Sequence, residues 1–439
     1  MTASQALPCK VMFFCILYPT VPPLVHHYIR RGVFCSNLFV NLLFNRKFAR
    51  NPRFDRKMIS RSITEKLLSM GNIFPIVTLT GPRQSGKSTL LKSILPDYHY
   101  VSMEDPDNRL IANEDPRGFL KTYPDKTIID EVQRVPELFS YLQTHVDAEN
   151  REGMYYLAGS QNFLLMQSIS QSLAGRTAIL KLLPFSHREM KKAEIIPTSV
   201  NNEIFQGGYP RIYDKKIQPT DFYPSYIQTY IEKDLRLLKN IDDLSKFIRF
   251  IKLCAGRIGQ LLNLSSLANE TGIAVSTVQS WLSVLEASYI IYLLKPDHNN
   301  YSKRLIKSPK LYFCDTGLAS SLLGIEDEKQ LSTHFLRGGL FENMVINEFI
   351  KDAFNNGKEP NLAFWRDSTG NEVDLLISIK GKQLAYEIKS GATYSSDDFK
   401  GIKVWANLSK TSPDDCYVIY SGDKRLSTSY GEVIPWDEL

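Results

Sequence analysis

The sequence of 439 residues predicts an α/β protein in which a parallel sheet is followed by a helical region and by a second α/β region. Three observations predict this organisation. A glycine-rich loop at residues 81–89 lies between a β-branched apolar run and a helical segment, a helix-turn-helix pattern occupies residues 264–282, and a charged hairpin occupies residues 372–390. Because a chain of this length usually contains about three domains, three folded regions also agree with its size.

The glycine-rich loop has the spacing G-x-x-x-x-G-K-S, between a strand at residues 76–80 and a helix at residues 89–95. This context disfavours a chance glycine-rich turn. Glycines let backbone N–H groups approach phosphates, and the helix N-terminus favours negative charge. Lys87 can reach the β- and γ-phosphates, and the Ser88 hydroxyl can ligate Mg²⁺. We therefore expect ATP and Mg²⁺ to bind through Gly81, Pro82, Arg83, Gln84, Ser85, Gly86, Lys87, Ser88 and Thr89.

A second apolar strand, at residues 127–129, ends in the carboxylates Asp130 and Glu131. In ATPases with such a loop, the first carboxylate orients the hydration shell of Mg²⁺ and the next one polarises the attacking water. We assign these roles to Asp130 and Glu131, against the alternative of a solvated strand end. A third strand, at residues 154–159, ends in Ser160 and Gln161, and either side chain could sense the γ-phosphate or the attacking water.

Further strands are expected at residues 98–102 and 178–182, so that strands and helices alternate. Alternation of this kind predicts a parallel sheet that is covered on both faces, with ATP at the carboxyl ends of its strands. The cation of Arg176 could stabilise transition-state charge, within one chain or across a subunit interface. A solvated surface arginine is the alternative for Arg176, and Arg134 is a weaker candidate for the same role.

The middle of the chain is rich in helical patterns, including an amphipathic run at residues 226–235. Residues 264–282 predict two helices with a turn at Gly272, the second helix beginning near Ser276 as its N-cap. Residues 289–294 then predict the strand of a wing. This pattern leaves two roles open, which are DNA binding and a structural or protein-contacting winged helix.

Charge argues against DNA binding by the second of these helices. Residues 276–286 contain no Lys or Arg, although phosphate contacts from basic residues dominate DNA affinity. The wing region does offer basic residues, namely Lys295, Lys303, Arg304, Lys307 and Lys310.

The C-terminal region has the carboxylates and the lysine of a metal-dependent nuclease. Glu342 is expected to open a helix over residues 341–350, and Asp374, Glu387 and Lys389 have the spacing D-x12-E-x-K. Residues two apart in a strand share a face, so Glu387 and Lys389 should lie together, with Asp374 on the paired strand. Carboxylates there can hold Mg²⁺ while the lysine polarises water or a phosphate. An ordinary charged strand is the alternative, and cleavage activity stays open.

The net charge of +6 is concentrated near the N-terminus. Residues 1–57 contain nine Lys or Arg and one acid, Asp55, which leaves 44 basic and 46 acidic residues in the rest of the chain. The apolar runs of residues 1–57 are short and interrupted, whereas a membrane span needs about 20 apolar residues. We expect this segment to be an extension outside the folded unit that need not be native, with a membrane anchor as the alternative. Cysteines far apart and without C-x-x-C spacing favour a reduced, cytoplasmic protein.

Three motifs have been described so far: the glycine-rich loop, Asp130-Glu131, and Asp374 with Glu387-Ile388-Lys389-Ser390. The sequence contains several more. They are Gln133-Arg134-Val135-Pro136, Leu157 to Gln161, Leu173 to Arg176, Gly207-Gly208-Tyr209-Pro210, Tyr230-Ile231-Glu232-Lys233-Asp234, Phe313-Cys314-Asp315-Thr316-Gly317-Leu318 and Gly339 to Glu342. Together these motifs resemble a prokaryotic family of AAA-type ATP-binding proteins. Its members join an ATPase domain, a winged-helix region and a C-terminal domain of the restriction-endonuclease type.

The resemblance covers about residues 58–439 and implies a division of the chain. The expected parts are the extension at residues 1–57, an AAA-type P-loop ATPase domain at 58–205, a helical or winged-helix domain at 206–325 and a restriction-endonuclease-like domain at 326–439. The first function hypothesis is an ATPase that acts on DNA or RNA through the C-terminal domain. The second is an ATP-dependent switch that binds protein partners and has an inactive nuclease fold. The third, a membrane-tethered ATPase, requires the N-terminal segment. A homo-oligomer is compatible with each.

A chain that begins at Met58 should fold as the whole chain does, because residues 1–57 lack the balanced charge of the remainder and lie outside the resemblance. We expect the shortened protein to be soluble and to match the whole chain in melting temperature and ATPase rate. Calorimetry and a phosphate-release assay measure both. Loss of folding on removal of residues 1–57 would place that segment in the folded unit.

Overall fold

The computed structural model describes residues 59–439 apart from 161–164, 166–168, 170, 236–242 and 298–306, with the backbone alone for residues 232–235. The expected extension and three site candidates, Gln161, Lys303 and Arg304, therefore lie outside the described residues. Within the part of the chain that is described, no helix has the length and apolarity needed to cross a membrane.

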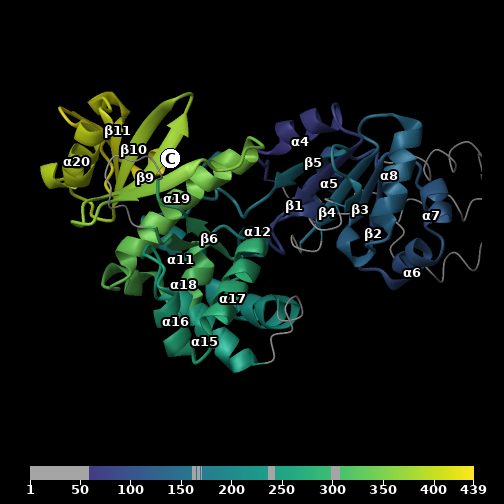
Figure 1. Cartoon of the computed structure of the whole chain (residues 1–439), viewed down its shortest axis with the longest axis horizontal. Helices are drawn as coiled ribbons and strands as arrows, with labels where there is room; N and C mark the ends of the chain where they lie inside the picture. Colours follow the sequence, from purple (N-terminus) through teal and green to yellow (C-terminus); the bar gives the residue numbers. More distant parts are fainter. Residues whose placement is uncertain (1–58, 161–164, 166–168, 170, 236–242, 298–306) are drawn as a thin grey trace, which may run out of the picture. The chain divides into compact units, whose positions relative to one another are not determined.

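The first region is built on a five-stranded parallel sheet in the order β2-β3-β4-β1-β5 (Figure 1). Every residue of the central strands β1 and β4 is buried, as expected for a parallel sheet covered on both faces. The predicted parallel sheet is thus confirmed. The strands are β1 (Ile76–Thr80), β2 (His99–Ser102), β3 (Thr127–Asp130), β4 (Tyr155–Gly159) and β5 (Thr177–Lys181).

Helices cover both faces of this sheet. Leu67 and Leu90, from α4 and α5, belong to the apolar cluster on one face, whereas Phe119 and Phe139, from α7 and α8, belong to the cluster on the other. The helices are α4 (Thr64–Gly71), α5 (Lys87–Ile94), α6 (Pro106–Glu114), α7 (Pro116–Thr122) and α8 (Leu138–Glu149), with a 3₁₀ turn η1 (Val132–Arg134) after β3.

The helical region contains the predicted helix-turn-helix segment, but its second helix begins earlier than expected. The turn at Gly272 has a left-handed φ of 72°, which favours glycine. Helix α17 begins at Val275 with Ala274 as N-cap, so the prediction that Ser276 is the N-cap is wrong. Ala274 already has the extended backbone of a cap, which leaves Ser276 inside the first turn.

The elements of this region pack mainly as helices, with one antiparallel pair, β6–β7. They are α10 (His187–Lys192), α11 (Val200–Gln206), α12 (Pro210–Lys215), α13 (Pro219–Tyr226), a π-helix η2 (Ile227–Leu235), α15 (Leu244–Ala255), α16 (Leu264–Thr271), α17 (Val275–Ala287), β6 (Ile291–Leu294), β7 (Lys310–Phe313), α18 (Thr316–Leu322) and a 3₁₀ turn η3 (Glu328–Ser332). The amphipathic run predicted at residues 226–235 is mostly π-helical and follows Pro224, which lacks the N–H of a regular helix.

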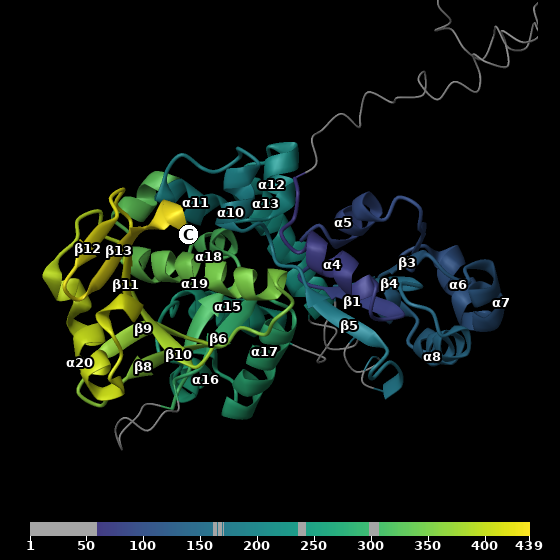
Figure 2. The ribbon, with the colours of Figure 1, turned by 90° about the horizontal axis from the view of Figure 1, so that it is seen from above.

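The C-terminal region is a six-stranded mixed sheet in the order β12-β13-β11-β10-β9-β8, with α19 and α20 packed on it (Figure 2). Leu375 and Ile388 join a cluster that includes α19, whereas Leu376 and Ala385 join a cluster that includes α20. The alternation of neighbouring residues between the two clusters follows from the two-residue period of a strand.

The elements of the C-terminal region are α19 (Arg337–Asn355), β8 (Leu362–Arg366), β9 (Glu372–Ile379), β10 (Lys382–Lys389), η4 (Ser396–Phe399), α20 (Lys400–Ser409), η5 (Pro413–Asp415), β11 (Cys416–Tyr420), β12 (Leu426–Thr428), β13 (Gly431–Pro435) and η6 (Trp436–Glu438). One continuous apolar cluster joins the helical region, α19 and one face of this sheet. The expected division at residues 325–326 therefore falls within a shared core, and the four-part division stays a prediction.

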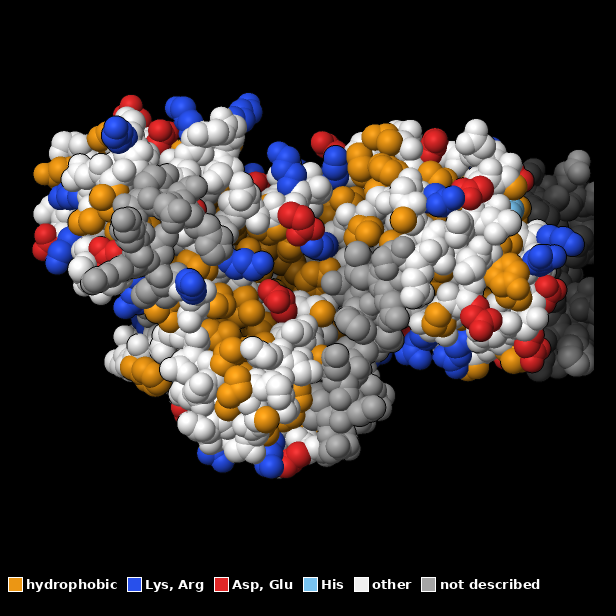
Figure 3. Space-filling model, in the orientation of Figure 1, with side chains coloured by type: hydrophobic (Ala, Val, Ile, Leu, Met, Phe, Trp, Pro, Cys, Tyr) orange, Lys and Arg blue, Asp and Glu red, His pale blue; other side chains and the backbone are white. Residues whose placement is uncertain are grey.

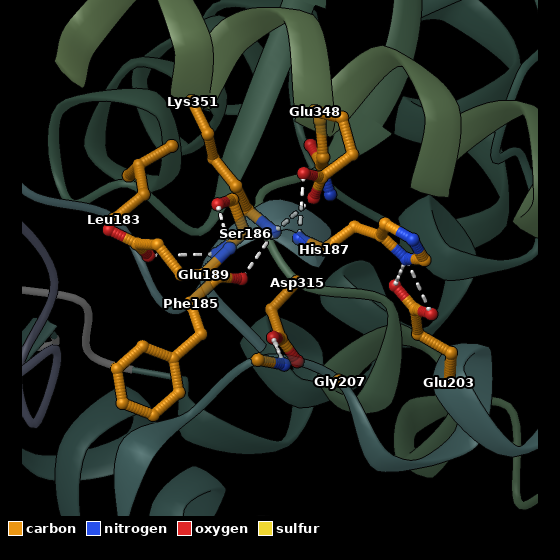
Figure 4. A network of polar contacts seen from close by, with 12 residues as sticks. Leu183, Phe185, Ser186, His187, Glu189, Glu203, Gly207, Asp315, Glu348 and Lys351 are labelled. Carbon is orange, nitrogen blue, oxygen red and sulfur yellow. Dashed lines mark hydrogen bonds and ion pairs between the residues drawn. The ribbon is translucent and has the colours of Figure 1, made fainter. Parts of the chain in front are cut away.

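The segment between β5 and α11 is held by polar contacts to helix α19 (Figure 4). The ammonium of Lys351 donates to the Phe185 carbonyl at 2.8 Å and to Glu348 at 2.9 Å, and the backbone N–H of His187 donates to Glu348 at 2.8 Å. Lys351 and Glu348 thus bind the start of α10 to the C-terminal region.

His187 is buried in this network, with its Nδ1 3.0 Å from Glu203 Oε2. Burial opposes a charge on the imidazole, but the hydrogen bond and negative charge of Glu203, aided by Glu348 and the Asp437 carbonyl, outweigh it and raise the pKa of His187. A pKa that folding raises contributes stability below the unfolded pKa of about 6.5, and this contribution is lost as the pH rises through the folded pKa.

Glu203→Gln should therefore lower the melting temperature more at pH 6 than at pH 9. The expected loss at pH 6 is a few degrees, on the scale of about 1 kcal/mol in a large domain. Calorimetry at both pH values measures this, with Glu149→Gln as the control because Glu149 pairs with an exposed Arg151. An equal loss at the two pH values would contradict a charged His187.

Candidate functional site

The glycine-rich loop leaves the carboxyl end of β1 and enters α5 at Lys87. Gly81 has a φ of 152°, and a Cβ there would lie 2.1 Å from the Leu182 carbonyl oxygen, so only glycine fits. Gly86 has a φ of 94° as the N-cap of α5. These two positions let the loop pass close to β5 and present its backbone at the helix N-terminus.

The Lys87 ammonium lies across the loop, where it donates to the carbonyls of Gly81 at 3.0 Å and Pro82 at 2.9 Å. Burial lowers the pKa of Lys87 to about 8, although the negative charges of Glu131 and Asp130 oppose the fall. The first residue of α5 thus places a desolvated cation against the glycine-rich loop.

Ser88 and Asp130 meet at the carboxyl ends of β1 and β3. The Ser88 hydroxyl donates to Asp130 Oδ2 at 2.7 Å, and the Tyr100 hydroxyl donates to the same oxygen at 2.6 Å. The other oxygen of Asp130, Oδ1, is buried and has no hydrogen-bond partner among the described residues. Burial and the bond to Asp130 raise the pKa of Tyr100. Tyr100 was not among the sequence candidates, and only its position in β2, a strand beside β3, could have indicated it.

Glu131 has a left-handed backbone, with a φ of 53°, directly after β3. Its Oε2 accepts from the Ser160 hydroxyl at 3.1 Å and from the Gln133 amide at 2.5 Å. Left-handed backbone in a residue other than glycine is uncommon and concentrates at functional sites. The structure therefore brings Glu131 and Ser160 together, and adds Gln133, which the sequence analysis recorded only as part of a motif.

Arg176 is not at this edge of the sheet. Its carbonyl accepts from the N–H of Ile76, which places it at the amino end of β1, and its guanidinium pairs with the exposed Asp147 at 2.6 Å and 2.8 Å. Within one chain, Arg176 and the glycine-rich loop therefore lie at opposite ends of β1. Arg134 lies nearer the loop, because it and Arg83 approach the same carboxylate, that of Glu104, at 3.8 Å and 3.3 Å.

Arg61 is a further residue that the sequence analysis missed. Its buried guanidinium donates to the Ser85 carbonyl at 2.9 Å, to the Leu183 carbonyl at 2.7 Å and to Glu189 at 3.1 Å. The loop is therefore fastened to the segment that leads into α10. No local pattern marks Arg61, because its partners come from distant parts of the chain.

The C-terminal candidates Asp374, Glu387 and Lys389 lie together on β9 and β10. Asp374 Oδ2 accepts from the backbone N–H of Ile388 at 2.9 Å, and the Lys389 ammonium lies 2.5 Å from Glu387 Oε1. Burial, followed by the negative charge of Asp374, raises the pKa of Glu387. The second oxygen of Glu387 is buried, and no group in the described part of the chain forms a hydrogen bond with it.

Glu342 approaches this group from α19, but it does not open the helix. Helix α19 begins at Arg337, so Glu342 lies in its second turn and the expected helix start is wrong. The extra turn packs closely through Gly339, where a Cβ would lie 2.7 Å from the Ile258 carbonyl oxygen. Burial and the charge of Asp374 raise the pKa of Glu342.

Lys310 is buried and is not available to nucleic acid. The expectation that it is one of the basic residues offered by the wing is therefore wrong. The side chain is 2% exposed and its ammonium contacts Glu342, Glu372 and Asp374. Burial is unfavourable for this ammonium, but the surrounding negative charges outweigh it and raise the pKa of Lys310. Among the described residues, no group of three or more His, Cys, Asp or Glu side chains is arranged to hold a metal ion.

The surface over the helix-turn-helix segment carries little positive charge on the face shown in Figure 3. Its described part there is mainly apolar and uncharged polar, with the basic side chains at its margin. This agrees with the absence of Lys and Arg from residues 276–286.

Comparison with known families divides the chain into three matched segments. Residues 74–191 match an AAA domain, residues 197–329 a domain of unknown function (DUF8612) and residues 337–439 a domain of unknown function (DUF4143). The chain therefore contains an AAA-type P-loop domain, followed by a helical region and a mixed sheet whose families have no assigned function.

Relatives along most of the chain are uncharacterized proteins. One from Mycobacterium tuberculosis is 28% identical over 372 residues, which cover 83% of this chain and 81% of that protein. One from Methanocaldococcus jannaschii is 23% identical over 420 residues, which cover 82% of this chain and 85% of that protein.

Solved structures are similar over half of the chain or more. A Walker-type ATPase of Pyrococcus abyssi has a TM-score of 0.41 at 13% identity, covering 60% of this chain and 96% of its own. The RuvB Holliday junction branch migration motor of Thermotoga maritima has a TM-score of 0.30 at 20% identity, covering 53% of this chain and 89% of its own.

Proposed function

We propose that the AAA-type domain binds ATP with Mg²⁺ at residues 81–89 and hydrolyses it. The observation that carries this proposal is the meeting of Lys87, the Ser88–Asp130 pair and Glu131 at the carboxyl edge of one parallel sheet. Ligands of α/β sheets bind at this edge.

The residues present fit such a ligand. The loop N–H groups and the Lys87 ammonium suit phosphate oxygens, and phosphate offers Lys87 a charged partner in place of two neutral carbonyls. The Ser88 hydroxyl and the partnerless oxygen of Asp130 suit Mg²⁺, directly or through its waters. Bound Mg²⁺ would neutralise charge that develops on the phosphates.

Glu131 is the proposed base that polarises the attacking water, with Ser160 and Gln133 as the groups that orient its carboxylate. A catalytic role for Arg176 requires a second subunit, because within one chain it lies at the opposite edge of the sheet. A catalytic role for Arg176 therefore requires a homo-oligomer, whereas the proposed role of Glu131 does not.

The first hypothesis for the rest of the chain is action on nucleic acid through a nuclease-like C-terminal domain. The contacts among Asp374, Glu387 and Lys389, and the approach of Glu342, support it. The helix-turn-helix segment supports nucleic-acid binding by its pattern alone, since α17 lacks basic residues.

The second hypothesis is an ATP-dependent switch that binds protein partners through a nuclease-like fold that does not cut. The specific observation in its favour is the Lys310 ammonium among the carboxylates that a metal would need. We therefore place the switch first for the C-terminal region, with ATP hydrolysis as its driving reaction.

Substitutions in the AAA-type domain should separate nucleotide binding from hydrolysis. Lys87→Ala removes the main cation on the phosphates, so we expect ATP affinity to fall. Glu131→Gln should leave ATP affinity nearly unchanged and lower kcat by about 10²–10⁴-fold, as loss of a general base does. Fluorescent-nucleotide titration and phosphate release measure the two effects. Glu137→Gln, an exposed neighbour, is the control, and hydrolysis by Glu131→Gln at the parent rate would refute its role.

A cleavage assay separates the two hypotheses for the C-terminal region. Under the switch hypothesis, single-stranded and duplex DNA and RNA stay intact with Mg²⁺ or Mn²⁺, with or without ATP, and Asp374→Asn behaves as the parent does. Metal-dependent cleavage that Asp374→Asn abolishes would put the nuclease hypothesis first. ATP hydrolysis is measured on the same samples, so a failed ATPase and an inactive C-terminal region are told apart.

A further inference from the structure

The cluster at β9, β10 and α19 contains a cation that comes from the helical region. Lys310, the first residue of β7, places its ammonium 2.9 Å from Glu342 Oε1 and 3.3 Å from Asp374 Oδ1, and in contact with Glu372 Oε1. The three carboxylates come from α19 and β9, whereas β7 pairs with β6 of the helical region. The ammonium therefore joins two regions of the chain at one point.

The position of Lys310 is built into the fold and is not that of a chance surface pair. Its side chain is 2% exposed, and the ammonium lies 5.6 Å from the centre of the Phe364 ring. An ammonium that has lost its water needs several oxygen partners, and three carboxylates supply them. A buried cation of this kind is stable only while the carboxylates around it remain charged partners.

The charges of the cluster nearly balance when Lys310 is counted. With every group ionised, four carboxylates face three cations among the described residues of the cluster, namely Glu342, Glu372, Asp374 and Glu387, with Lys310, Lys389 and Arg366. A divalent ion added to this set would leave an excess of positive charge. Without Lys310, the same set would have an excess of two negative charges, which suits a divalent ion.

The oxygens that would hold a metal are also occupied. Glu342 Oε1 and Asp374 Oδ1 bind the ammonium, and Asp374 Oδ2 accepts from the N–H of Ile388 at 2.9 Å. Mg²⁺ binds oxygen at about 2.1 Å and Mn²⁺ prefers the same ligands, so an ammonium in contact with these atoms excludes either ion. The buried Oε2 of Glu387, which has no hydrogen-bond partner within the part of the chain that the structure describes, is a further oxygen that a metal could use.

We propose that Lys310 is the resident cation of this carboxylate site and that it keeps divalent metal out. Glu342, Asp374 and Glu387 are not arranged to hold a metal as they stand, and we infer that removal of Lys310 lets them close on Mn²⁺ or Mg²⁺. The inference goes beyond ATP hydrolysis and holds whether or not the chain hydrolyses ATP. On this proposal, Lys310 is the reason why the nuclease-like set of carboxylates would not cleave nucleic acid.

The test counts bound Mn²⁺ on the whole chain without nucleotide, by electron paramagnetic resonance of the free ion and by the shift in melting temperature. Lys310→Met keeps the length of the side chain and removes its charge. We expect this variant to bind one more Mn²⁺ per chain than the parent does, with at least tenfold higher affinity than any Mn²⁺ site of the parent. Mn²⁺ should also raise the melting temperature of the variant and not that of the parent. Adding Asp374→Asn should abolish the new site.

A matched control is Lys351→Met, which also removes a buried lysine from a carboxylate, Glu348, but lies outside the cluster. It should bind no more Mn²⁺ than the parent. If Lys310→Met alone does not fold, Lys310→Met with Glu372→Gln removes one negative charge, keeps the three expected ligands and gives the same test. Parent binding of Mn²⁺ that Asp374→Asn removes would overturn the proposal, as would folded Lys310 variants that bind no additional Mn²⁺.

Discussion

The buried guanidinium of Arg61 is the contact on which the link between the glycine-rich loop and helix α10 depends. It binds the glycine-rich loop at Ser85, the segment before α10 at Leu183, and α10 itself at Glu189. Loss of one member of a buried, hydrogen-bonded ion pair leaves an uncompensated charge, which usually costs about 3–5 kcal/mol. The loop therefore cannot change its backbone freely without a response from this segment.

Helix α19 contacts the start of α10 and also bears Glu342 of the C-terminal carboxylate site. Lys351 and Glu348 hold the start of α10, and Glu342 lies nine residues before Lys351 on the same helix, about 13 Å along its axis. Since α19 shares one apolar core with the helical region, these contacts lie within one closely packed unit.

Much of the fold and part of the candidate site could be predicted, because short-range rules govern them. The loop between β1 and α5 follows from its spacing, and Glu387 and Lys389 share a face because strands have a period of two. The start of α17 was misplaced because Ser276 has the right chemistry for a cap but the backbone turns earlier. Arg61 and Tyr100 escaped prediction because their partners are brought to them only by the packed sheet.

Lys310 shows most clearly what a pattern of residues leaves open. Its sequence context, a basic wing, predicts a phosphate contact, and the carboxylates predict a metal. Both expectations treat charged groups separately, whereas burial forces opposite charges to meet wherever the fold allows it. Lys310 and Asp374 are 64 residues apart, so their contact depends on how β7 packs against β9 and α19. The chemistry of the C-terminal site is thus decided by the cation that fills it, and not by the carboxylates alone.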